Sequence, residues 1–276
     1  MREYVALSGF PDYSSIVHLF IGGSELHGAK LEGTDDHDIY GVYIEPPEVI
    51  LGTDAMQRDH QHFVWSTSGT DQRNTADDID LTLFSLQKWA YLACKGNLTK
   101  MHFLFAENMV NVPPADDVCV TIWPEIIRHR DKFLAKSHLD AIIHFSDDQL
   151  ARLTGAKGKG KKGQRPELEE KHGFDTKAAM HTLRILYEGK ELMKTGKISL
   201  PGPQQALLID IRKGKWNLGQ VLAHAEDLKR ECLAAQSKSP LPDTLDRDSV
   251  NRIVAKAYRD FWEWKSAQYG ALTAKK

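Results

Sequence analysis

The stretch Phe20-Ile-Gly-Gly-Ser-Glu-Leu-His-Gly28, followed by Asp35-Asp-His-Asp-Ile-Tyr-Gly-Val-Tyr-Ile44, decides the fold of this chain. Residues 16–21 are mostly apolar and end at two glycines, a pattern that predicts a buried strand stopped by a tight turn. Gly23 and Ser24 then open a short helix, whose first backbone N–H groups could hold a phosphate. The sequence therefore predicts a strand, a phosphate-binding turn and a second strand that begins with acidic residues.

Asp36 and Asp38 begin the second strand of this stretch. Because side chains alternate along a strand, the two carboxylates should point to one face. Neighbouring carboxylates repel each other, and a divalent cation with oxygen ligands relieves that repulsion. A third carboxylate on a neighbouring strand would complete a two-metal site. Asp80, which lies between two apolar residues, is the first candidate, and Asp78 is its rival because both share a face if that strand starts early.

The order Gly-Ser, eleven residues, Asp-x-Asp and a distant apolar-Asp-apolar strand resembles the DNA polymerase beta superfamily of nucleotidyltransferases. The chain is also similar to a branch of predicted nucleotidyltransferases associated with RNA repair. The segments that carry this similarity are spread over most of the chain: 41–47, 80–86, 95–97, 174–177, 181–184 and 239–242. The resemblance implies an α/β N-terminal nucleotidyltransferase fold with a mixed sheet, and transfer of an NMP from an NTP to an acceptor hydroxyl with release of pyrophosphate.

The same resemblance assigns a role to each part of the motif. Asp36, Asp38 and Asp80 are expected to be the catalytic carboxylates and to hold two Mg²⁺ ions, for which Mn²⁺ could substitute. Gly23 and Ser24 are expected to hold the β- and γ-phosphates of the NTP.

A predicted helix that begins near residue 175 carries three further candidates. Lys177, His181 and Arg184 follow i, i+4 and i+7 spacing and therefore share one face. Spacing alone favours a solvated face with ordinary ion pairs. Similarity to the family's Lys-x-x-x-His-x-x-Arg helix favours nucleotide binding, in which Lys177 and Arg184 grip the triphosphate and His181 donates to it.

Composition excludes several classes of protein. Hydrophobic residues make up 41% of the 276 and charged residues 27%, with no apolar run near the ~20 residues that a membrane helix needs. No secretory signal is visible. Cys94, Cys119 and Cys232 are widely spaced and indicate neither a disulfide framework nor a zinc site. We therefore expect a cytoplasmic protein, and the sequence does not predict an oligomeric state.

The charge pattern bears on the acceptor. A net charge of −2 provides no globally basic surface for nucleic acid. Residues 151–165 nevertheless carry six cations and no acid: Arg152, Lys157, Lys159, Lys161, Lys162 and Arg165. This Gly-Lys segment could clamp a phosphate backbone, or it could be a solvated loop between two helices. With the association with RNA repair it favours RNA as the acceptor, while DNA, a protein or a small-molecule hydroxyl stay open.

We predict two domains, a nucleotidyltransferase catalytic domain at 1–112 and an all-α helical domain at 113–276 that closes over the cleft. The division rests on the near disappearance of strand-like runs after Pro113-Pro114. Besides the strands already named, residues 62–66 predict another strand. Helical periodicity and capping residues predict helices at about 86–95, 99–106, 124–136, 139–153, 175–194, 217–236 and 247–267.

Two other functions compete with the nucleotidyltransferase. A metal-dependent phosphohydrolase would use His60, His62, Asp77 and Asp78, since imidazole and carboxylate ligands suit zinc, iron or manganese, although no recognisable spacing supports it. A catalytically silent nucleic-acid-binding module would use the 155–165 loop and the aromatic residues of 261–264. At helical spacing those aromatic residues are more typical of a core. An inert variant would be expected to have lost one of the three catalytic carboxylates, and all three are present.

Overall fold

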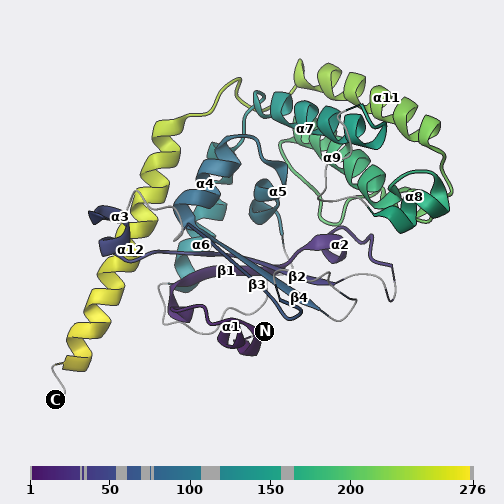
Figure 1. Ribbon diagram of the computed structural model, residues 1–276. Helices are drawn as coiled ribbons and strands as arrows, with labels where there is room; N and C mark the ends of the chain where they lie inside the picture. Colours follow the sequence, from purple (N-terminus) through teal and green to yellow (C-terminus); the bar gives the residue numbers. More distant parts are fainter. Residues whose placement is uncertain are drawn as a thin grey trace.

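The computed structural model describes residues 2–31, 33, 36–53, 61–69, 75, 78–106, 119–156 and 165–273 (Figure 1). A four-stranded sheet in the order β1-β2-β4-β3 forms the N-terminal half. Its strands are β1 (Ile16–Ile21), β2 (His37–Tyr43), β3 (His62–Ser66) and β4 (Ile79–Ser85). β2 runs parallel to β4, whereas the pairs β1–β2 and β3–β4 are antiparallel, so the sheet is mixed as the sequence predicts.

The edge strand β1 is apolar on both faces because both faces of the sheet are covered there. Val17 and Phe20 of β1 pack into the largest core cluster together with helices that follow the sheet. Ile16 and Leu19 point the other way, into a smaller cluster that includes the first helix. This double burial explains why the segments read as short continuous apolar runs.

The N-terminal half also contains several short helices. They are α1 (Arg2–Leu7), α2 (Gly23–Leu26), α3 (Pro47–Leu51), α4 (Leu86–Cys94), α5 (Leu98–Met101) and the 3₁₀ turn η4 (His102–Leu104). Ser85 ends β4 and caps α4, because its hydroxyl accepts a hydrogen bond from the Lys88 backbone N–H at 3.2 Å. Gly96, at a φ of +77°, follows the end of that helix.

The C-terminal half is helical. Its helices are α6 (Cys119–Arg128), α7 (His138–Leu153), α8 (Pro166–His172), α9 (Thr176–Thr195), α10 (Gln205–Arg212), α11 (Leu218–Gln236) and α12 (Arg247–Thr273). The predictions for α7, α9 and α11 are confirmed to within a residue. The prediction of a helix at 124–136 is wrong at both ends, since α6 begins at Cys119, contains Pro124, and gives way to a 3₁₀ turn at Arg130–Phe133. The sequence reasoning missed the short helices α8 and α10.

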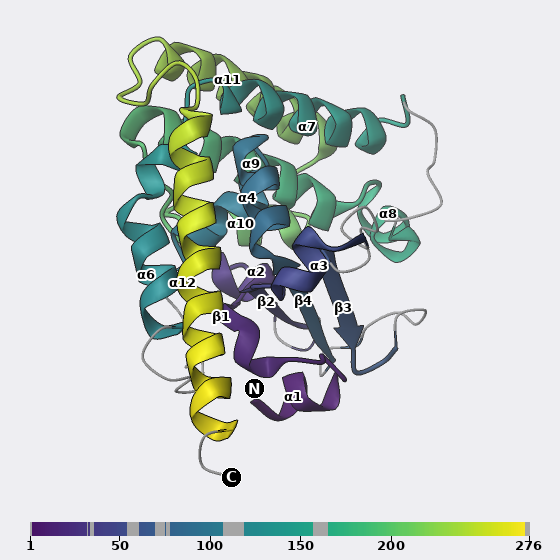
Figure 2. The same ribbon diagram turned by 90° about the vertical axis from the view of Figure 1, so that its left-hand side faces the viewer.

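α9 lies at the centre of the helical half and packs against α7, α10 and α11. α12 leaves that group and runs down the side of the molecule beside α6 and α4 (Figures 1 and 2). Its Tyr258 hydroxyl donates to Glu45 Oε2 at 2.5 Å, and its Trp262 Nε1 donates to the Glu45 backbone carbonyl at 2.8 Å. Phe261 is buried in the main core, which confirms that this aromatic cluster is structural.

The largest core cluster therefore takes side chains from both halves of the chain, such as Phe20 and Trp89 from one and Leu192 and Phe261 from the other. The predicted boundary at 112/113 falls in 107–118, outside the described residues, so the two-domain division stays a prediction. Among the helices that the structure describes, none combines the length and hydropathy needed to cross a membrane.

Candidate active site

The pairing of β2 with β4 places two of the predicted carboxylates side by side. Asp38 and Asp80 are direct partners in the parallel register, so their side chains lie on the same face of the sheet. Asp36 precedes β2 by one residue and is separated from Asp38 by two, which brings it to that face as well. The Gly22 N–H donates to the Asp38 carbonyl at 2.8 Å and ties the glycine turn to this strand. The structure thus brings together all three predicted carboxylates and the Gly-Ser turn.

The electrostatics of Asp38 show how crowded this face is. Its pKa is raised to about 7, first by burial and then by the negative charges of Asp36 and Asp80, while Lys177 acts in the opposite direction. The Tyr40 hydroxyl donates to Asp38 Oδ1 at 3.4 Å. A carboxylate that is expensive to ionise beside two others is the environment that a divalent cation stabilises, so the residues present fit metal binding.

The glycines of the turn are required by contact with this strand. Gly23 has a φ of +57°, and a Cβ at this position would lie 1.8 Å from Asp38 Oδ2. A Cβ at Gly22 would lie 2.1 Å from the ring of Tyr40. The backbone of the turn therefore lies against the face that carries Asp38 and Tyr40, and any side chain would displace the carboxylate or the tyrosine.

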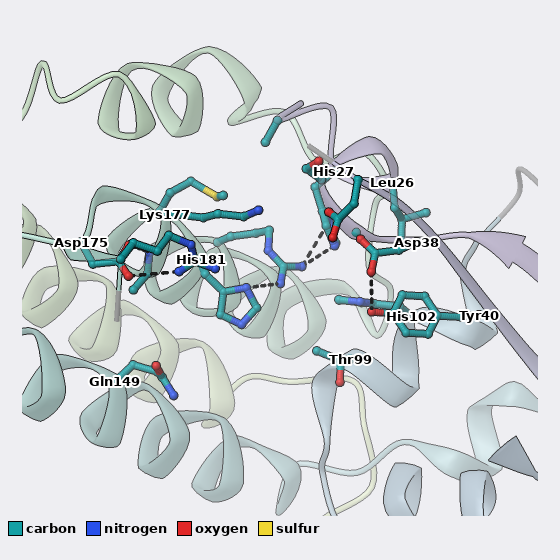
Figure 3. A pocket seen from close by; sticks show the side chains of 18 of the residues that line it. Leu26, His27, Asp38, Tyr40, Thr99, His102, Gln149, Asp175, Lys177 and His181 are labelled. Carbon is teal, nitrogen blue, oxygen red and sulfur yellow. Dashed lines mark hydrogen bonds and ion pairs between the residues drawn. The ribbon is translucent and has the colours of Figure 1, made fainter. Parts of the chain in front are cut away.

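A cleft of about 980 Å³ opens over this face (Figure 3). Its floor includes Gly23, Ser24, Asp36 and Asp38, and α9 supplies the opposite wall. Asp80 lies beside Asp38 on the adjacent strand but does not itself line the cleft. The volume is at the upper end of the range for small-ligand sites and has room for a nucleoside triphosphate.

Helix α9 presents its predicted cationic edge to this cleft. Asp175 caps the helix by accepting a hydrogen bond from the Ala178 N–H at 2.9 Å. Lys177, His181 and Arg184 all line the cleft, and Lys177 extends from α9 toward Asp38 (Figure 3). The three residues of the helix motif and the carboxylates of the sheet therefore face the same space, from opposite halves of the chain.

Arg184 is held in a buried polar network rather than extended into solvent. Its Nη1 donates to Glu188 Oε1 at 3.0 Å, and its Nη2 donates to His181 Nδ1 at 2.8 Å. Burial and the Arg184 charge keep the pKa of His181 well below its ordinary value, so the imidazole is neutral. Because Nδ1 accepts from Arg184, the ring proton lies on Nε2.

Glu188 connects this network to the N-terminal half. Arg184 holds the pKa of this buried carboxyl well below its usual range despite the opposing effect of burial, so Glu188 is ionised. It accepts a hydrogen bond from His102 Nε2 at 2.8 Å, and His27 Nδ1 lies 3.2 Å from its other oxygen. The ligand atoms of His27, His102 and Glu188 lie within 4.8 Å of one another, close enough to hold a metal ion. The Arg184 guanidinium already supplies positive charge there, so a metal ion would have to displace it.

The remaining candidates have different surroundings. Arg165 lines the cleft and donates to Asp175 Oδ2 at 3.0 Å, while Lys157, Lys159, Lys161 and Lys162 lie outside the described residues. Asp78 accepts hydrogen bonds from Thr67 and Thr75, which engages it in a loop next to β4 and favours Asp80 as the third carboxylate. For the phosphohydrolase set, His60 and Asp77 also lie outside the described residues.

Several residues that line the cleft were not predicted. His27 and His102 join it through the Glu188 network, Gln149 contributes from α7, and Lys100 lies 4.0 Å above the Phe84 ring. Burial lowers the pKa of Lys100 to about 8. The only local sequence signal for this network was the position of Glu188 one turn beyond Arg184, because i,i+4 residues of opposite charge meet on a helix.

The site combines neighbouring carboxylates on one face of the sheet, a glycine turn in contact with them and a cationic helix edge across the cleft. This is the arrangement expected of a nucleotidyltransferase. The chain matches the RNA repair pathway DNA polymerase beta family over residues 9–256 and belongs to that family. The resemblance seen in the sequence motifs is thereby confirmed. No curated protein matches the chain.

Proposed function

We propose that this protein transfers an NMP from an NTP to an acceptor hydroxyl and releases pyrophosphate. The observation that carries the proposal is the placement of Asp38 between Asp36 and Asp80, in contact with the Gly23 turn and within electrostatic reach of Lys177. Family membership supports the same reaction class.

The carboxylates of Asp36, Asp38 and Asp80 would hold the metal ions. Two divalent cations, Mg²⁺ first, would supply activation of the acceptor hydroxyl and neutralisation of the leaving pyrophosphate when bound there. The protein's own contribution is to fix three oxygen donors on a rigid sheet. Tyr40 orients one of them by donating to Asp38 Oδ1.

The α9 edge would bind the triphosphate. Lys177 contributes a positive charge opposite the carboxylates, and the neutral His181 offers its Nε2–H as a hydrogen-bond donor to a phosphate oxygen. Arg184 orients His181 through the hydrogen bond to Nδ1 and adds its charge from a buried position. Gly23 and Ser24 would present backbone N–H groups to the β- and γ-phosphates, since first-turn amides of a helix have no partner within the helix.

We further propose that the acceptor is an RNA end. The family's link to RNA repair supports this choice over DNA, protein and small-molecule hydroxyls. Base preference depends on pocket shape, to which Gln149 and Glu169 contribute from α7 and α8.

The test is incorporation of label from each α-labelled NTP into RNA in the presence of Mg²⁺. The Asp36→Asn/Asp38→Asn double variant should lose incorporation entirely, because it removes two metal ligands with little change in shape. Asp80→Asn should also lose activity, whereas Asp78→Asn should keep it and serves as the matched control. Full activity in the double variant would overturn the proposal.

A further inference from the structure

A second groove, outside the catalytic cleft, lies between α4 and α12 and has a volume of about 690 Å³. Lys88 lines it from α4, and Arg247 and Arg259 line it from α12. Among the described residues that line it, none is an aspartate or a glutamate. In a chain with 38 acidic and 36 basic residues, such a surface is a local departure from an almost balanced charge.

The opposite side of α12 provides an internal comparison. There a smaller groove carries three cations, Arg128, Arg252 and Lys256, together with the acids Glu125 and Asp260. Arg128 pairs with Glu125 at 2.6 Å, and Lys256 pairs with Asp260 one turn further along the helix. In the α4–α12 groove, by contrast, the three cations form no ion pair with any residue in the described ranges. Unpaired cations around a concave surface attract an anionic ligand.

The groove also offers contacts suited to nucleobases. Tyr91 on α4 is 52% exposed, which is unusual for a large aromatic side chain and suits stacking on a base. Gln61, Gln87 and Asn251 add amide groups that can donate and accept hydrogen bonds. A site for single-stranded nucleic acid combines cations that bind phosphates, an exposed aromatic ring and amide groups, and this groove has all three.

Two lysines, one from the groove and one from the catalytic cleft, act on His62 between them. Lys100, which lines the cleft, and Lys88, which lines the groove, both lower the pKa of His62, after the larger effect of burial. The His62 ring stacks on Phe84, whose other contacts include the Lys100 ammonium group. Asp80 and the α4 cap at Ser85 are five residues apart on β4, a span of roughly 17 Å. A strand of a few nucleotides can bridge that distance.

We propose that the α4–α12 groove binds the phosphate backbone of single-stranded RNA, with the strand continuing past His62 toward the cleft. Lys88, Arg247 and Arg259 contact phosphates, and Tyr91 stacks on a base. Only the idea that the strand's end lies at the catalytic carboxylates rests on the proposed function. Binding in the groove itself does not require nucleotide transfer.

The test compares two triple variants of the full chain. Lys88→Gln/Arg247→Gln/Arg259→Gln removes the groove cations, and Arg128→Gln/Arg252→Gln/Lys256→Gln removes the same charge on the other side of α12. Glutamine keeps helix propensity close to that of lysine and arginine, and thermal unfolding verifies that both variants fold. Affinity for a fluorescein-labelled single-stranded RNA of about 12 nucleotides is measured by anisotropy across salt concentrations, without NTP.

The groove variant should bind RNA more than tenfold more weakly at low salt. Its log–log salt slope should flatten by about two units, since each lost phosphate contact on a single strand removes about 0.7. The control variant should keep the wild-type slope. An unchanged salt slope in the groove variant, or an equal loss of affinity in the control variant, would refute RNA binding in the groove. Wild-type protein that binds RNA in this way but transfers no NMP would overturn the proposed function alone.

Discussion

Substitution of Gly23 by alanine gives the sharpest test of how the turn and the carboxylates depend on each other. The new Cβ would lie 1.8 Å from Asp38 Oδ2, whereas ordinary contacts begin near 3.4 Å. The carboxylate must therefore retreat by about 1.6 Å, because the turn is tied to β2 by the Gly22 hydrogen bond. A shift of about 1 Å in a catalytic group can cost 10²-fold in rate, so we expect Gly23→Ala to lose at least about 100-fold in NMP incorporation.

The matched control is Gly9→Ala. Gly9 has a φ of +75°, and no atom of the described residues lies within 4 Å of an added Cβ, so it shares the backbone strain of Gly23 without the collision. Each variant should lose about 1–2 kcal/mol of unfolding free energy, because a side chain in the left-handed region is strained. Labelled-NTP incorporation and urea unfolding are measured on both. If Gly23→Ala incorporates NMP within threefold of Gly9→Ala, the coupling between the turn and Asp38 is wrong.

Three further predictions concern buried polar groups. His18 is fully buried, its ring nitrogens have no hydrogen-bond partner among the described residues, and burial lowers its pKa to about 3. Between pH 7.5 and 5.0 the unfolded chain therefore binds a proton at His18 that the native state does not bind. The wild type should lose about 2 kcal/mol of unfolding free energy over this range that His18→Leu retains. Urea unfolding at the two pH values measures the difference. Tyr258→Phe removes the donor to buried Glu45 and should cost about 1–3 kcal/mol in urea unfolding, and a cost below 0.5 kcal/mol would contradict the contact. Glu188→Gln removes the anionic partner of buried Arg184 and should cost about 3 kcal/mol of unfolding free energy, with a rise in the KM for NTP. Unchanged stability and KM would show that the network contributes neither to folding nor to NTP binding.

Much of the candidate active site was predictable because its sequence signals are local. The glycine pair, the alternation of Asp36 and Asp38, and the apolar residues around Asp80 each depend on neighbours within a few positions. Helical periodicity over many turns likewise placed α9 almost to the residue. Short helices such as α8 offer too few turns for periodicity to register, and the loop interpretation of that region hid it.

What only the tertiary structure decided is which distant residues meet. The sequence allowed Asp78 or Asp80 as the third carboxylate, and the parallel register of β2 with β4 placed Asp80 beside Asp38. The sequence placed Arg184 on a cationic helix face, but the residues that bury Arg184 include His27, 157 positions away in the chain. Helix periodicity and turn chemistry are properties of adjacent residues, whereas pairing of strands and closure of a buried charge network depend on how the whole chain packs.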